Sequence, residues 1–346
     1  MRLLKAILKF LLRRISVAVA TVFVVTVLIF LLVRMIPGDP VAAAFSQTGE
    51  FTKAQLDAFR KEMGLDKSWP EQYLLLIWNL LHGRAGTSAI TFRDSMIDVL
   101  YYFPATLELT LLAMTLAFTL GVMFGITAGL TNRKVFDNFL SFWSISGLSY
   151  PNFLVAILLQ VVVANTLGWF PLTGRIEPGF EIQRVTGLML LDTLLAGNIR
   201  AFWSALRSLV LPAATLAFAP SATLMRLIRA NTIREKNKSY IAALRANGLP
   251  RSLLIWRYLL PNAVGPALTM AGIQFANTLG GSFVIETIFM YPGNGWLGTG
   301  AMISKDINMI QAVTLLISVY FVISNLLVDF LHTYIDPRIR LKEVPV

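Results

Sequence analysis

Long apolar runs alternate with shorter polar stretches along the whole chain. An α-helix rises about 1.5 Å per residue, so about 20 apolar residues are needed to cross a hydrocarbon core about 30 Å thick. Six windows are about that long or longer: 15–33, 105–130, 139–167, 209–228, 263–285 and 309–331. The pattern therefore predicts an all-α, polytopic membrane protein with six transmembrane helices.

The polar segment between the first two windows predicts a small helical module outside the membrane. Within it, the spacing of apolar residues predicts a helix over 52–63. Ser68 and Glu71 then have the spacing of a capping box, which predicts a second helix that runs to Leu81. That helix is too short to cross the membrane. We expect it to lie on the membrane surface or against the transmembrane helices.

A basic polar block, residues 229–262, interrupts the apolar second half of the chain. Its helical spacing and its glycine and proline residues predict two short helices, 233–246 and 251–260. Gly248 is suited to end the first helix, and Pro261 is expected to close the second. We expect the block to form a hinge of two small helices that is exposed to the cytosol.

These features divide the chain into four parts. They are the N-terminus with the first span (1–36), the extracytoplasmic module (37–103), a five-span core that contains the hinge (104–331) and a cytoplasmic tail (332–346).

Composition agrees with a membrane protein, since 56% of the 346 residues are hydrophobic, 14% are charged and the mean hydropathy is +0.66. The net charge of +11 reflects topology. Seventeen of the 30 Lys and Arg residues lie in the N-terminus, 132–137, 229–261 and the tail, against eleven in the loops of the other side. The positive-inside rule therefore places both termini in the cytoplasm. Charges so scattered, without a base-reading motif, argue against nucleic-acid binding.

The hinge carries a group of residues at distinctive spacing, in which a Leu-Pro pair stands twelve residues beyond a glycine. The group consists of Tyr240, Ala242, Ala243, Arg245, Gly248, Leu260 and Pro261. It resembles the EAA loop of binding-protein-dependent ABC importer permeases, in the version typical of peptide permeases. The resemblance implies that these residues form the coupling loop, which docks in a groove of an ATPase subunit. Ala242, Leu244 and Asn247 depart from the motif, and Ala242 stands where its name-giving Glu would be.

Further segments extend the resemblance over nearly the whole chain. In order along the sequence they are 34–40, 104–109, 286–298, 325–329 and 336–340. They resemble segments of the peptide and nickel branch of the same permease family. One such segment would be a weak signal, but several in register are specific. The resemblance therefore implies the type I ABC importer permease fold.

The resemblance also implies a function, that of a permease subunit of an ATP-driven peptide importer in the bacterial inner membrane. The implied partners are a second homologous permease subunit, two ABC ATPase subunits, an extracytoplasmic peptide-binding protein and membrane lipid. No Walker lysine loop is present, since the glycine-rich 293–295 segment lacks the lysine. We therefore expect no enzyme activity and no cofactor in this chain, with ATP and Mg on the partner subunits. The chain has no Cys and only two His residues, so no metal site is expected.

A secondary transporter driven by an ion gradient is the alternative class, and nickel or an oligosaccharide is the alternative cargo. An ion-coupled carrier needs buried ionisable groups. The acids at predicted membrane depth are Glu108, Glu286 and Asp329, all near span ends, and we expect them to have interfacial or packing roles. Glu108 is expected in the first turn of its span, where the helix dipole favours a carboxylate.

Two groups of residues inside the predicted spans bear on packing and transport. Gln274, Asn277 and Thr278 are expected to face a translocation path, with hydrogen bonds between helices as the alternative. Glycines at every fourth position over 121–129, and others over 265–281, are expected to permit close helix packing.

Overall fold

The computed structural model describes residues 2–35, 60–61, 66–131 and 134–335. Within these residues the regular secondary structure is helical, and the one extended pairing is an isolated bridge between Thr87 and Asp94. The all-α prediction is therefore confirmed. The predicted helix over 52–63 lies almost entirely outside the described residues, and the segments 36–40 and 336–346 lie wholly outside them.

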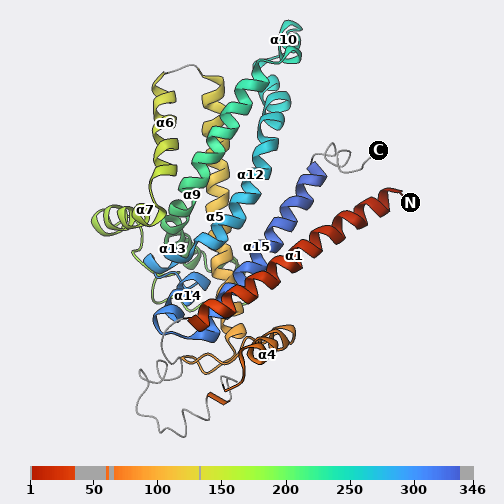
Figure 1. Ribbon diagram of the computed structural model, residues 1–346. Helices are drawn as coiled ribbons and strands as arrows, with labels where there is room; N and C mark the ends of the chain where they lie inside the picture. The colour runs from red at the N-terminus through yellow and green to blue at the C-terminus, as the bar shows by residue number, and fades with distance from the viewer. Residues whose placement is uncertain (1, 36–59, 62–65, 132–133, 336–346) are drawn as a thin grey trace.

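Two long helices, α5 (Ser95–Leu130) and α9 (Ile199–Lys236), lie side by side at the centre of the bundle (Figure 1). Glycines one turn apart on α5 allow this close approach. A methyl group at Gly129 would lie 2.5 Å from Thr232 Cβ, which is well inside van der Waals contact. The close packing predicted from the glycines of 121–129 is therefore confirmed.

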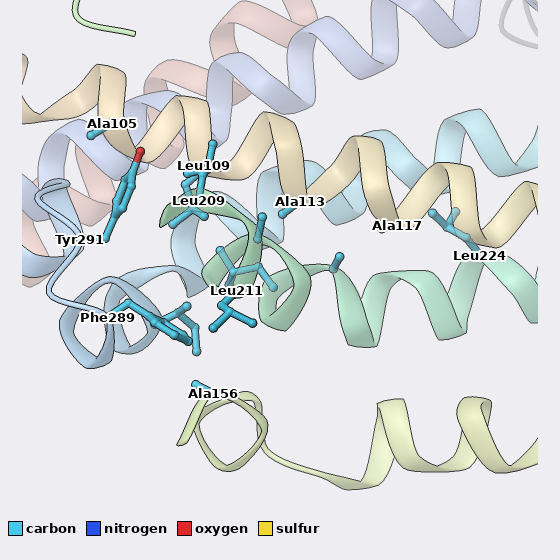
Figure 2. Packing of buried hydrophobic residues seen from close by; sticks show 14 of the residues in the cluster. Ala105, Leu109, Ala113, Ala117, Ala156, Leu209, Leu211, Leu224, Phe289 and Tyr291 are labelled. Carbon is cyan, nitrogen blue, oxygen red and sulfur yellow. The ribbon is translucent and has the colours of Figure 1, made fainter. Parts of the chain in front are cut away.

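Apolar side chains fill the interface between α5 and α9 (Figure 2). Phe289 and Tyr291 come from the turn between α13 (Phe283–Ile288) and α14 (Asn294–Ile303), and they close one end of this core. The α5 side consists of three alanines, a leucine and an isoleucine, and the α9 side consists of four leucines, two alanines and an isoleucine. The members labelled on the two long helices are Ala105, Leu109, Ala113, Ala117, Leu209, Leu211 and Leu224.

Three more long helices follow on one side of this pair (Figure 1). α12 (Leu260–Gly281) packs against α9 and against α15 (Ile307–Ile335), and α1 (Arg2–Met35) lies along α15. Gly272 permits the contact between α12 and α15, because a methyl group there would overlap the side chain of Val328. The other glycines of α12 have open space beside them. The close packing predicted for 265–281 therefore holds at one position.

Four of the described helices are long and apolar enough to cross a membrane, namely α1, α5, α9 and α15. A bent pair of helices adds a fifth candidate if the pair is counted as one span. α12 is 22 residues long and is not among these four. The multi-span class is confirmed, and the count of six stays a prediction.

The third predicted span, 139–167, is not one straight helix. α6 (Lys134–Ser149) is followed by α7 (Asn152–Leu159), which continues as the π-helix η1 (Gln160–Thr166). The helix axis bends by 111° between α6 and the α7–η1 segment. Pro151 lies at the break. It has no backbone N–H to donate, and its ring disfavours a helical backbone at the residue before it.

Two helices extend beyond the apolar windows that predicted them. α5 begins at Ser95 and continues through Pro104, so the end of the predicted 37–103 module and the following span form one helix. α9 extends beyond 209–228 at both ends. Polar helix ends carry no hydropathy signal, which explains the short windows. Glu108 consequently lies in the interior of α5, and its predicted place in a first turn is wrong.

The second helix of the module is confirmed as α4 (Trp69–Leu81). Its capping box forms as predicted, since the Ser68 backbone N–H donates to the Glu71 carboxylate over 3.0 Å. α4 packs against α1 through Tyr73, whose hydroxyl lies 3.0 Å from that of Thr26. The helix therefore lies against a transmembrane helix, which is one of the two expected positions.

Candidate functional site

The candidate site is the hinge that follows α9, at the opposite end of the bundle from α13 and α14 (Figure 1). α9 ends at Lys236, and α10 (Ser239–Ala246) begins after a break of two residues. The single helix predicted over 233–246 is therefore wrong. Its first part belongs to the long helix α9, and only its second part forms the small helix of the hinge.

The second half of the hinge is continuous with the next long helix. α11 (Arg251–Leu253) and the π-helix η2 (Leu254–Leu259) lead directly into α12. The prediction that Pro261 closes this helix is wrong. Leu260 and Pro261 are the first two residues of α12 and follow η2 directly, so the helical path continues through the proline.

A glycine turn joins the two halves, as predicted. Gly248 has a φ of +77°, the left-handed conformation that glycine adopts without strain. Its N–H donates to the Arg245 carbonyl, and the N–H of Leu249 donates to the Leu244 carbonyl over 3.2 Å. These two bonds form a Schellman motif, which satisfies the last carbonyls of α10. The direction in which α11 leaves α10 is therefore fixed by hydrogen bonds.

A hydrogen-bonded group fastens α10 to its neighbours, and we call it the Tyr240 latch (Glu235, Tyr240 and Asn262). The Tyr240 hydroxyl donates to the Glu235 carboxylate of α9 over 3.0 Å and accepts from the Asn262 amide of α12 over 3.4 Å. The other oxygen of Glu235 accepts from Lys238 over 2.5 Å. Burial, and then the bond to Glu235, raise the pKa of Tyr240 above its usual value, so the phenol stays protonated and continues to donate.

Sequence reasoning missed Glu235 and Asn262 as members of the site. Glu235 is only 7% exposed, although it lies at the end of a helix. It is the single acid in 229–262, and a lone carboxylate among seven basic residues was the available signal. No comparable signal distinguishes Asn262, because an amide can bond in many ways.

The predicted coupling residues divide into braced and exposed groups. Tyr240 belongs to the latch, and Leu260 is half-buried at the start of α12. Ile241 is fully buried and anchors α10. The remaining five predicted residues are exposed, and they are Ala242, Ala243, Arg245, Gly248 and Pro261. The hinge thus presents small side chains and a cation on a braced support.

The three residues expected to face a translocation path do not share one environment. Asn277 is exposed on α12, and Gln274 is half-buried. Thr278 is buried, and its hydroxyl donates to the Gln274 carbonyl over 2.7 Å and lies 3.7 Å from the sulfur of Met114 on α5. Thr278 therefore takes part in helix packing, and Asn277 has the position open to a path.

Two of the acids at membrane depth bond to groups of the chain itself. Glu108 forms an ion pair with Arg175 over 2.5 Å and accepts a hydrogen bond from the Tyr291 hydroxyl. Glu286 accepts from the Ser282 hydroxyl and from backbone N–H groups in the first turn of α14. Both arrangements fit the packing roles expected of these acids. Among the described residues, no group of three metal-binding side chains occurs.

A multi-span helical bundle that exposes a braced hinge at one end fits the class of membrane transport subunits. Comparison with protein families makes this specific. Residues 121–341 match the family "Binding-protein-dependent transport system inner membrane component", and residues 7–96 match the N-terminal family of the same systems. The chain belongs to this family of ABC importer permeases, whose fold is the type I permease fold.

Curated relatives match the chain over nearly its full length. The di/tripeptide transport system permease protein DppB of Pseudomonas aeruginosa is 36% identical over 96% of this chain and 99% of the relative. The dipeptide transport system permease protein DppB of Escherichia coli K12 is 34% identical over 97% and 100%. The glutathione transport system permease protein GsiC of Pectobacterium atrosepticum is 33% identical over the same shares. The chain is thus a multi-pass component of a bacterial inner-membrane transport system.

Proposed function

We propose that this chain is one permease subunit of an ATP-driven importer of short peptides. The relatives named above transport di- and tripeptides, dipeptides and glutathione, according to their names, and all three cargoes are short peptides. The observation that carries the proposal is the hinge, because α10 is exposed to a partner and fastened to both α9 and α12. A displacement of α10 is therefore transmitted to two long helices, α9 and α12.

Energy for transport comes from partner subunits in this proposal. Two ABC ATPase subunits bind ATP and Mg, a second homologous permease subunit forms the other half of the path, and an extracytoplasmic binding protein delivers the peptide. Membership of a binding-protein-dependent family supports this assembly. The chain itself carries neither a Walker lysine loop nor a cofactor in this scheme. Both termini and the hinge lie in the cytoplasm, which the positive-inside count supports.

Transport proceeds by rigid-body rotation of helices between inward-open and outward-open states. α9 runs without a break from the hinge to the outer end, and the glycine contacts lock α5 against it. Closure of the ATPase dimer moves α10, and the α5–α9 pair tilts with it. The exposed amide of Asn277 on α12, with Gln274 beside it, lies along the path that this movement opens.

Uptake by sealed vesicles tests the proposal against the secondary-transporter alternative. The vesicles contain the complete transporter, and they receive binding protein loaded with a labelled dipeptide. Uptake should stop when internal ATP is removed and continue when ionophores collapse the proton and sodium gradients. Uptake that survives ATP removal but stops with the ionophores would assign the chain to the secondary transporters. Vesicles without the ATPase subunits serve as the control.

A further inference from the structure

The exposed side of the hinge has a charge pattern that specifies what it can bind. We call this side the hinge surface and define it by Ala242, Ala243, Arg245, Ala246, Gly248 and Arg251, all of which are exposed. No Asp or Glu occurs over 236–262, whereas five Lys and Arg residues do. The hinge surface is therefore purely cationic in its charged groups.

The only acid within 229–262 is already used inside the chain. Glu235 is 7% exposed, and its two oxygens bond to Lys238 and to Tyr240. A cation on a partner therefore cannot reach this carboxylate without breaking the latch. Ala242, which stands where the family motif has its name-giving Glu, supplies no charge either.

The shape of the hinge surface is as specific as its charge. Three alanines cover the exposed side of α10, so a partner can approach its backbone closely. Arg245 and Arg251 lie on either side of the Gly248 turn, at its two edges. Within the described residues, the guanidinium group of neither arginine forms a hydrogen bond or an ion pair with the rest of the chain. Both guanidinium groups are therefore available to a partner.

We infer that the hinge surface docks in a partner groove with a small, apolar floor and an acidic rim. This inference rests on the proposed function, which makes the partner an ATPase subunit, and adds the chemistry of its groove. An apolar helix face in a groove is a common recognition mode, and complementary charges at the rim fix register and steer the encounter. Carboxylates at the rim pair with Arg245 and Arg251, and the floor receives the alanines.

The test measures binding of the ATPase subunits to the permease pair in nanodiscs of zwitterionic lipid. The variant Arg245→Glu/Arg251→Glu reverses the charge of the hinge surface and removes no side-chain hydrogen bond or ion pair among the described residues. Lys134→Glu, an exposed residue at the start of α6, is the matched control. At about 0.1 M salt the double reversal should weaken binding by about tenfold, and near 1 M salt, where screening acts within about 3 Å, the difference should largely disappear. The control variant should bind as the wild type does.

The possible outcomes separate the two proposals. Equal or tighter binding of the reversed variant at low salt would overturn the acidic rim while leaving the proposed function intact. A loss of binding that appears only when anionic lipid is present would also overturn it, because the arginines would then serve the membrane surface. If the wild type binds no ATPase at any salt concentration, both proposals fail.

Discussion

Tyr240 is the residue on which the position of the hinge depends most directly. Its hydroxyl is the only atom through which α10, α9 and α12 share one hydrogen-bonded group among the described contacts. The acceptor on α9 is a carboxylate, and hydrogen bonds to charged groups are stronger than those between neutral groups. A single oxygen atom thus connects the exposed surface of the hinge to two long helices.

Removal of this hydroxyl should uncouple the hinge from the bundle. Tyr240→Phe loses both bonds of the latch, at a cost of about 1 to 2 kcal/mol, or roughly a five- to thirtyfold fall in the equilibrium constant between the braced and the unbraced hinge. We expect more ATP to be hydrolysed per peptide imported, with normal insertion in the membrane. Tyr258→Phe is the matched control, since the Tyr258 hydroxyl forms no hydrogen bond with the described residues. The ratio of ATP hydrolysed to peptide imported should not change in this variant. An unchanged ratio in Tyr240→Phe would contradict the role of the latch.

Met290 is strained in the turn between α13 and α14. Its φ of 46° places a residue other than glycine in the left-handed region, and its side chain is 59% exposed. Met290→Gly should therefore raise the free energy of unfolding by roughly 0.5 to 1 kcal/mol, since relief of about 1 to 2 kcal/mol of strain is partly offset by the greater backbone entropy of glycine. Thermal unfolding in detergent measures the change. Met290→Val should have the opposite sign, because a branched Cβ tolerates this conformation least.

At the scale of helices, the sequence predicted most elements and missed their junctions. Apolar windows located α5, α9, α12 and α15, because their buried or lipid-facing residues dominate hydropathy. The same windows could not register the bend at Pro151, since α7 and η1 are as apolar as a straight span. Pro261 was misjudged for a related reason. A proline that ends one helix and a proline that opens the next have the same local sequence signal.

The coupling site was predicted in part for equally physical reasons. The glycine turn at Gly248 has a local signal, and it was found. The latch depends on Glu235 and Asn262, which are 27 positions apart in the sequence and meet only because α9 and α12 pack together. Contacts between distant segments leave no periodic pattern. The charge of the hinge surface, in contrast, is readable from the sequence once exposure is known.

The glycine contacts of α5 predict how glycine-to-alanine variants change the stability of the protein. Gly129→Ala places a methyl group 2.5 Å from Thr232 Cβ, so α5 and α9 must separate, and stability should fall by about 1 to 3 kcal/mol. Gly280→Ala on α12 meets no atom within 4 Å and should raise stability by about 0.5 to 1 kcal/mol, as alanine favours helix over glycine. Unfolding of both variants in detergent compares them. Equal changes in stability in the two variants would show that helix packing does not distinguish Gly129 from Gly280.

For the whole molecule, a buried ion pair connects the loop that follows η1 to the α5–α9 pair. Glu108 of α5 binds Arg175, from the loop that follows η1, and Tyr291, from the turn before α14. Arg175 also donates to the Gly187 carbonyl over 2.7 Å. In the proposed mechanism the segments at this end move with α5, and the movement of α10 at the other end reaches them through α9.

Replacing one partner of this ion pair should destabilise the protein far more than replacing both. Arg175→Met leaves a buried carboxylate without its cation and should cost about 3 to 5 kcal/mol. The double variant Glu108→Gln/Arg175→Met should recover most of that loss, because neither buried charge remains. Thermal unfolding of the two variants gives the comparison. If the double variant is as unstable as the single one, the pair does more than neutralise charge.

Coupling through the hinge requires that an ATPase subunit touch the exposed side of α10. The chain has no cysteine, so Ala243→Cys introduces a unique reactive site on the hinge surface. Cross-linking in the assembled transporter should capture an ATPase subunit from this position, and Ile303→Cys, which is 77% exposed at the other end of the molecule, should capture none. Failure of Ala243→Cys to capture an ATPase, or its labelling from outside intact cells by a reagent that cannot cross the membrane, would contradict the account.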